Sequence, residues 1–172
     1  MYTLQEIENY RCPRWEDWPD LDLYMDQVVS VLEKKVTIFY PDEQAKPVTA
    51  MMINNYVKQK IITPSKNKKY QREHLAYLYV IFLLKSVLNL TDIYNGITLL
   101  SQLHSIEKVY DIFCDEIEAA LATAFSGKEN RIGREELEGV QVIHAITLAF
   151  AYTQRAKFLF ANQEKSEDLP TE

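Results

Sequence analysis

Amide and ammonium side chains between positions 51 and 72 are the groups in this chain best suited to bind a polyanion. Asn54 and Asn55 are adjacent, and a side-chain amide donates and accepts hydrogen bonds together, which matches the adenine edge in the major groove of DNA. Met51 can contact a thymine methyl group, and Lys58 can reach a phosphate. Basic residues further along can hold a phosphate backbone without reading its sequence: Lys66, Lys68, Lys69 and Arg72.

The charge of the chain is unevenly distributed. The formal net charge is −6 over 172 residues, yet residues 46–73 contain seven basic side chains and one acidic side chain. This segment therefore carries +6, and the remainder carries −12. Such asymmetry favours nucleic acid or another anion as partner. The alternative is a solvated loop that contains several lysines by chance, next to a structural helix with surface amides.

Helices are the elements expected to position these residues. Four glycines and six prolines leave few turns for a sheet of short strands, so the fold class is predicted to be mainly α. Thr49 is a suitable N-cap for a short helix over about 50–59. Residues 65–69 form a polar loop of the size of a hairpin tip. Apolar residues on nearly every side of 72–88 predict a central, buried helix.

Longer helices are predicted on both sides of this segment. Apolar residues spaced by three and four predict a helix after Pro19, whose apolar face comprises Leu21, Tyr24, Met25, Val28, Val31 and Leu32. Further helices are expected from a Thr91 cap to about 103, over about 106–125, and from about Arg134 to 160. The last of these is apolar on more than one side over 142–152. It therefore forms the centre of the C-terminal helices or packs against a second copy of the chain.

Other kinds of site find little support in the sequence. Cys12 and Cys114 form no CxxC or Cys/His cluster, and the histidines lack metal-ligand spacing. An acidic row at three- and four-residue spacing could hold a hard cation, although such acids are usually solvated: Asp111, Asp115 and Glu118. No glycine-rich phosphate loop or nucleophile motif is present. We therefore expect no catalytic residues, no metal, no cofactor and no enzymatic activity.

The first residues contain no apolar signal-peptide core, and the longest apolar run, 75–84, is too short to span a bilayer. These features predict a cytoplasmic protein that makes no contact with membranes.

The segment from Met52 to Ile62 resembles the recognition helix of MerR-type regulators, which leads into a wing. Pro64, the lysine-rich loop and Tyr70 lie where the wing follows in that family. Asn54 and Asn55 replace the usual arginine and tyrosine, and Lys60 replaces a glycine. The glycine-tyrosine-arginine core of the wing is absent. The resemblance implies a MerR-like winged helix-turn-helix module that binds DNA.

Three longer blocks resemble the bacterial domain-of-unknown-function family 1836. They are 14–17 together with 19–28, then 53–58, then 70–78, in the order of that family. The family carries no established activity, so the resemblance implies a bacterial cytosolic protein of that fold.

Together these features predict a MerR-like module with an N-terminal helix over 1–90, a C-terminal helical bundle over 91–163 and a disordered tail over 164–172. The expected function is that of a DNA-binding transcriptional regulator that binds double-stranded DNA as a homodimer through its C-terminal helices. The many aromatic residues of 77–160 are compatible with a small-molecule effector, although ordinary core is the commoner role. The alternative is a protein-interaction adaptor that has the helix-turn-helix shape without binding DNA.

Overall fold

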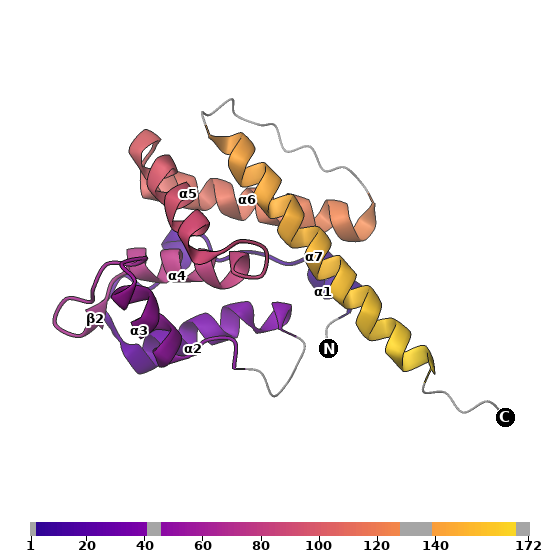
Figure 1. The fold of residues 1–172 in the computed structure, drawn as a ribbon, viewed down its shortest axis with the longest axis horizontal. Helices are drawn as coiled ribbons and strands as arrows, with labels where there is room; N and C mark the ends of the chain where they lie inside the picture. The colour runs from indigo at the N-terminus through magenta and orange to yellow at the C-terminus, as the bar shows by residue number, and fades with distance from the viewer. Residues whose placement is uncertain (1–2, 41–45, 128–138, 168–172) are drawn as a thin grey trace.

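A computed structural model describes residues 3–40, 46–127 and 139–167 of the chain, with side chains to residue 163. The expected mainly α fold is confirmed (Figure 1). The elements are α1 (Leu4–Glu8), η1 (Trp15–Asp17), β1 (Leu23–Tyr24), α2 (Met25–Val36), η2 (Thr37–Phe39), α3 (Ala50–Lys58), β2 (Lys69–Tyr70), α4 (Arg72–Leu84), α5 (Leu90–Leu103), α6 (Ile106–Ser126) and α7 (Val140–Glu167). The helix start expected near Arg134 lies outside the described residues, and α7 extends into the expected tail.

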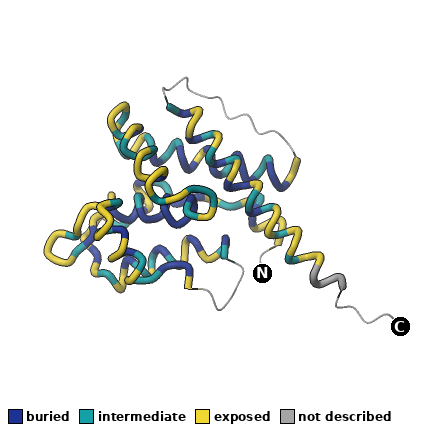
Figure 2. The backbone as a smooth tube through the Cα atoms, in the orientation of Figure 1, coloured by how far each residue is buried: buried dark blue, intermediate teal, exposed yellow. Residues whose placement is uncertain are grey.

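Helix α4 is the central element of the fold. Nearly all its side chains are buried (Figure 2), because α2 packs on one side of it and α5 and α7 on the other. On the side of α2, Tyr56 of α3 also contacts Phe82. One hydrophobic core runs from Ile7 to Ala151 and includes residues from both sides of position 90. Helix α4 ends at Leu84, four residues before the expected end, because Asn89 caps the next helix by accepting a hydrogen bond from the Asp92 amide at 2.9 Å. The cap predicted at Thr91 is therefore wrong by two residues.

The helix predicted after Pro19 begins only at Met25, because the two residues before it form a strand. Leu23 pairs with Tyr70, and Tyr24 with Lys69, in an antiparallel ladder. Leu21 and Tyr24 are 63% and 53% exposed, so their assignment to the apolar helix face was wrong. For Tyr24 the reason is the long-range pairing, because neighbouring residues of a strand point to opposite faces and Leu23 takes the buried one. Leu21 lies before the strand and outside any helix.

The hairpin tip predicted in residues 65–69 is present. Lys66 and Lys69 exchange backbone hydrogen bonds of 3.1 and 2.9 Å around a two-residue loop. Asn67 and Lys68 have φ values of 52° and 61°, which are the left-handed conformations of a type I′ turn. This turn type favours asparagine followed by glycine, so a lysine at the second position is locally unfavourable.

Replacing Lys68 with glycine is therefore expected to stabilise the protein by about 1 kcal/mol, because glycine adopts positive φ without strain. The corresponding rise in Tm is roughly 2–4 °C for a chain of this size. Lys66→Gly is the matched control: it removes the same charge at an extended position and is expected to be neutral or destabilising. Thermal melts of the wild type and the two variants measure these effects. A Tm of Lys68→Gly below that of the wild type would contradict the assignment of a type I′ turn.

Candidate nucleic-acid interface

Helix α3 has one buried face and one exposed face. It begins at Thr49, whose hydroxyl accepts a hydrogen bond from the Met52 amide at 3.2 Å. Ile53 and Tyr56 are buried, and the Tyr56 ring centroid lies 5.9 Å from that of Phe82 on α4. The opposite face carries the residues that the sequence analysis selected. All of them are exposed: Met51 (74%), Asn54, Asn55 and Lys58.

The end of α3 is fixed by a paired capping arrangement. The Ile61 amide donates to the Tyr56 carbonyl at 2.9 Å, and the Lys60 amide donates to the Val57 carbonyl at 3.0 Å. These are the two hydrogen bonds of a Schellman motif, in which the residue after the cap is left-handed. That residue is Lys60, with φ 59°. Its side chain is exposed next to α3. Lys60 was not among the predicted site residues, although its place just after a predicted helix end was a usable signal.

The lysines of the hairpin differ in their surroundings. Lys66 and Lys68 are exposed at the tip. Lys69 is half-buried, and its ammonium lies 5.3 Å from the centroid of the Tyr24 ring. The Arg72 side chain is only 18% exposed, and its guanidinium pairs with Glu16 at 2.9 Å and with Asp20 at 3.6 Å. Arg72 is thus engaged by carboxylates of its own chain and is not part of the exposed basic surface.

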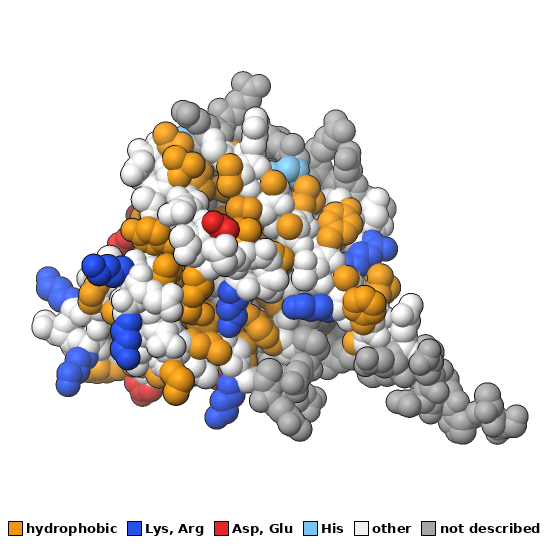
Figure 3. All heavy atoms as spheres, viewed as in Figure 1, with side chains coloured by type: hydrophobic (Ala, Val, Ile, Leu, Met, Phe, Trp, Pro, Cys, Tyr) orange, Lys and Arg blue, Asp and Glu red, His pale blue; other side chains and the backbone are white. Residues whose placement is uncertain are grey.

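Six of the eight selected residues therefore remain as exposed groups on α3 and on the hairpin tip. Together with Lys60, which lies between them in sequence, they define what we call the basic face: Met51, Asn54, Asn55, Lys58, Lys60, Lys66 and Lys68. Basic side chains gather over the end of the molecule that contains α2, α3 and the hairpin (Figure 3). This end is where the +6 segment of the sequence lies.

A half-buried amine at the end of α4 contacts the segment that precedes α3. The Lys85 ammonium donates to the Pro47 carbonyl at 3.2 Å and lies 4.6 Å from the Phe82 ring centroid. Burial lowers the pKa of Lys85. The contact ties the end of α4 to the residues just before Thr49, so the position of α3 depends on α4. No pattern in the sequence predicts this contact.

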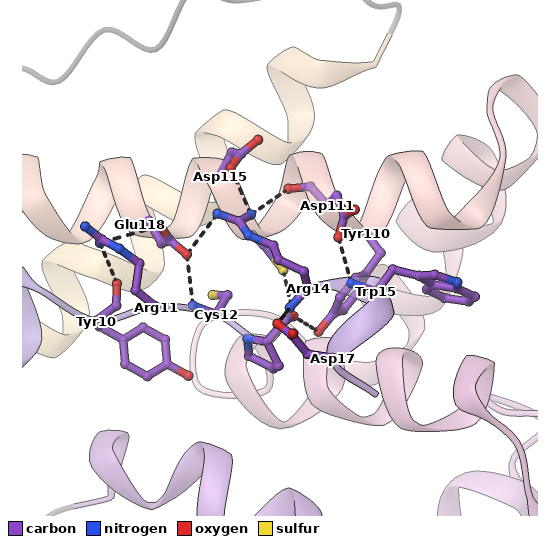
Figure 4. A network of polar contacts seen from close by, with 12 residues as sticks. Tyr10, Arg11, Cys12, Arg14, Trp15, Asp17, Tyr110, Asp111, Asp115 and Glu118 are labelled. Atoms are coloured by element: carbon purple, nitrogen blue, oxygen red, sulfur yellow. Dashed lines mark hydrogen bonds and ion pairs between the residues drawn. The ribbon is translucent and has the colours of Figure 1, made fainter. Parts of the chain in front are cut away.

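The acidic row on α6 pairs with the N-terminal segment of the chain (Figure 4). The Trp15 amide donates to Asp111 at 2.9 Å, and the Cys12 amide donates to Glu118 at 2.9 Å. Arg14 bridges Asp115 at 2.8 Å and Glu118 at 3.1 Å. These carboxylates therefore fix residues 11–15 against α6. Among the described residues, no group of three or more histidine, cysteine, aspartate or glutamate side chains is arranged to hold a metal ion.

Helix α7 also has two faces. α7 packs mainly on α6, and the buried residues of one of its faces are Ile143, Thr147, Phe150, Ala151 and Gln154. The Phe150 ring centroid lies 5.1 Å from that of Phe39. The other presents exposed residues at alternating spacings of three and four, which we call the α7 seam: Val142, Ala145, Ala149, Tyr152, Ala156, Leu159 and Gln163. The seam contains no charged side chain. The C-terminal half of α7 projects beyond the other helices (Figure 1).

No helix within the described ranges is long and apolar enough to cross a membrane. The family model described as "Domain of unknown function (DUF1836)" matches residues 13–113. The match contains α3, the hairpin and α4, and it ends within α6, before α7. No curated protein and no solved structure matches the chain.

Proposed function

The chain belongs to the DUF1836 family, because the family model covers more than half of it, and we propose that it is a DNA-binding transcriptional regulator. In this proposal α3 enters the major groove, and the hairpin acts as the wing of a MerR-like winged helix-turn-helix. The amides of Asn54 and Asn55 contact base edges, and the lysines contact phosphates. The protein acts as a homodimer, so that two copies of α3 meet two half-sites.

The observation that carries the proposal is the exposed basic face. A recognition helix needs an outward face free of packing and an inward face that fixes its orientation. Asn54 and Asn55 meet the first condition, and Ile53 and Tyr56 meet the second. The lysine hairpin follows α3 directly and is held to β1 by strand pairing, so its ammonium groups have a defined position relative to the fold.

Two lysines in unfavourable backbone conformations add support. Lys60 and Lys68 both have positive φ, where glycine would be less strained. Both are exposed and neither packs in the core. Residues that break a local preference without a structural gain tend to mark functional sites. If the positive charges of Lys60, just after α3, and of Lys68, at the hairpin tip, contact phosphates, both unfavourable conformations are explained.

The α7 seam supports the homodimer. Apolar residues spaced by three and four form the contact line of a coiled coil. Three of the seam residues are alanines, which let two helix backbones approach closely. A two-fold axis through the seam would bring the same residues of two copies together, as an isologous interface requires.

Binding to fluorescent duplexes from the region around the gene of this protein tests the proposal. We expect saturable binding at about 50 mM salt that weakens by a factor on the order of 10³ or more at 200 mM, because phosphate contacts release counterions. Absence of binding even at the lower salt concentration would overturn it. The adaptor alternative would then be favoured if a single protein partner were captured equally well by the wild type and by a Lys58/Lys66/Lys68→Ala variant.

A further inference from the structure

An apolar cavity, partly open to solvent, lies on the side of α4 away from α3. It lies among α4, α5, α6 and α7 and has a volume of about 70 Å³. Its walls are almost entirely hydrocarbon, with Val80, Ile93, Leu100, Phe113 and Ile143 as typical members. The space is several times what one water molecule needs, but the walls lack the two or more hydrogen-bond partners that hold a buried water. Such a cavity favours an apolar guest.

Gly96 is a second, independent observation that points to a binding role for the cavity. It lies in the interior of α5 and lines the cavity. A glycine inside a helix is less favourable than an alanine. A Cβ atom added at Gly96 would meet no atom within 4 Å, so no close contact requires the glycine. Its effect on the packing is to leave room between α5 and its neighbours.

The surface of the cavity itself is almost entirely hydrocarbon, so the few polar groups of its lining residues lie at its partly exposed rim. There they define the polar end of a ligand. The Tyr77 and Ser101 hydroxyls are 3.5 Å apart, which is a weak hydrogen bond that a better partner can replace. Asp92, another of the lining residues, is exposed, so its carboxylate lies at the same rim. It disfavours an anionic head group and accepts a hydrogen bond from a hydroxyl.

We propose that this cavity binds a small, uncharged, mainly hydrocarbon molecule with a hydroxyl at one end, and that this molecule is an effector. Its hydrocarbon part lies between α4 and α6, and its hydroxyl meets Tyr77, Ser101 or Asp92. The binding site stands on the cavity alone, whereas its regulatory role rests on the proposed function.

Helix α4 connects the cavity to the basic face. Ala76, Tyr77 and Val80 line the cavity. On the far side of the same helix, Phe82 contacts Tyr56 of α3, and its carbonyl accepts a hydrogen bond from Tyr40 at 2.8 Å. A guest that shifts or stiffens α4 therefore acts on the orientation of α3. Binding of the guest and of DNA are coupled, and the coupling is reciprocal.

The series from 1-butanol to 1-octanol tests the site, with binding followed by saturable shifts of leucine, isoleucine and valine methyl resonances. The dissociation constant is expected to fall about fourfold per methylene until the cavity is filled, and then to level off. Octanoate is expected to bind more weakly than octanol because of Asp92. Failure of every alcohol to give saturable shifts in the methyl groups of the cavity would overturn the proposal.

Two variants at Gly96 separate the cavity from general effects of alcohols. Gly96→Ala is expected to raise Tm by roughly 2–4 °C and to retain binding. Gly96→Leu fills the space and is expected to weaken octanol binding by at least about tenfold. Should Gly96→Leu melt below the wild type, Gly96→Val takes its place. Unchanged binding in the filled variant would overturn the proposal.

Because these measurements need no DNA, they remain valid if the protein binds none. The regulatory part is tested separately by the effect of octanol on DNA affinity in the wild type and in Gly96→Leu. A change in the wild type that the filled variant lacks supports an effector. An equal change in both, or none, would overturn the effector role and leave the binding site.

Discussion

The variant Asn54→Ala/Asn55→Ala is expected to lose its preference for a specific DNA sequence while its salt-dependent binding to any duplex persists. Each bidentate contact between an amide and a base is worth about 1–3 kcal/mol of discrimination, so the double variant should lose on the order of 10²–10³ in specific affinity. Both side chains are exposed, and Ile53 and Tyr56 still anchor α3. The fold and its Tm should therefore be unchanged or slightly improved.

Competition between a selected binding site and a scrambled duplex measures this loss. Lys66→Ala/Lys68→Ala provides the contrast. Removing phosphate contacts weakens binding to both duplexes equally, and the slope of log K against log salt concentration becomes shallower by about 0.9 per lost contact. Lys108→Ala/Lys157→Ala changes the net charge by the same amount on α6 and α7 and should leave both affinities almost unchanged. If the asparagine variant bound the selected site as the wild type does, α3 would not be the reading element.

The local features of the site were predictable because they depend on residues close together in sequence. Thr49 caps α3 as expected, and the apolar spacing assigned Asn54 and Asn55 to the exposed face. The hairpin tip follows from a short polar loop between apolar residues. Each of these features is decided within one helical turn or one tight turn, where side-chain type and spacing determine the conformation.

The features that the sequence did not reveal depend on distant partners. Tyr24 fits an apolar helical pattern, but its pairing with Lys69 places it in a strand. Arg72 is of the residue type that binds phosphates and lies in the basic segment, yet it forms ion pairs with Glu16 and Asp20 of its own chain. The spacing of residues along the chain does not show which distant carboxylate will reach a given guanidinium. The partners of Arg72 are therefore known only from the structure.

The acidic row of α6 is a case in which the sequence predicted the grouping of the residues but not their partner. Its spacing of four and three correctly placed Asp111, Asp115 and Glu118 on one helix face. What that face meets is the N-terminal segment, through two backbone amides and Arg14. A carboxylate that accepts backbone amides and pairs with arginine leaves few lone pairs for a cation. The residues were thus grouped correctly, and their partner lay about one hundred residues away in sequence.

A substitution in the α7 seam is expected to reduce both dimerisation and DNA affinity, because in the proposed function the dimer positions the two copies of α3. Ala149→Glu places a carboxylate in the middle of the seam, and in a symmetric dimer it does so twice. Burying unpaired charges in a helix contact is expected to weaken the dimer by about 100-fold or more. Loss of the dimer separates the two copies of α3, so the affinity for a two-half-site operator should fall with it.

Light scattering over a range of protein concentrations measures the dimer, and the same samples titrated with DNA measure the consequence. Lys157→Gln is the matched control, since it makes the same change in net charge at an exposed position of α7 outside the seam. It should leave both the dimer and the affinity unchanged. If Ala149→Glu dissociated the dimer without loss of DNA affinity, each copy would bind DNA alone. If the wild type were monomeric at all concentrations, the seam would have another partner, and the two-fold arrangement proposed for the basic faces would be wrong.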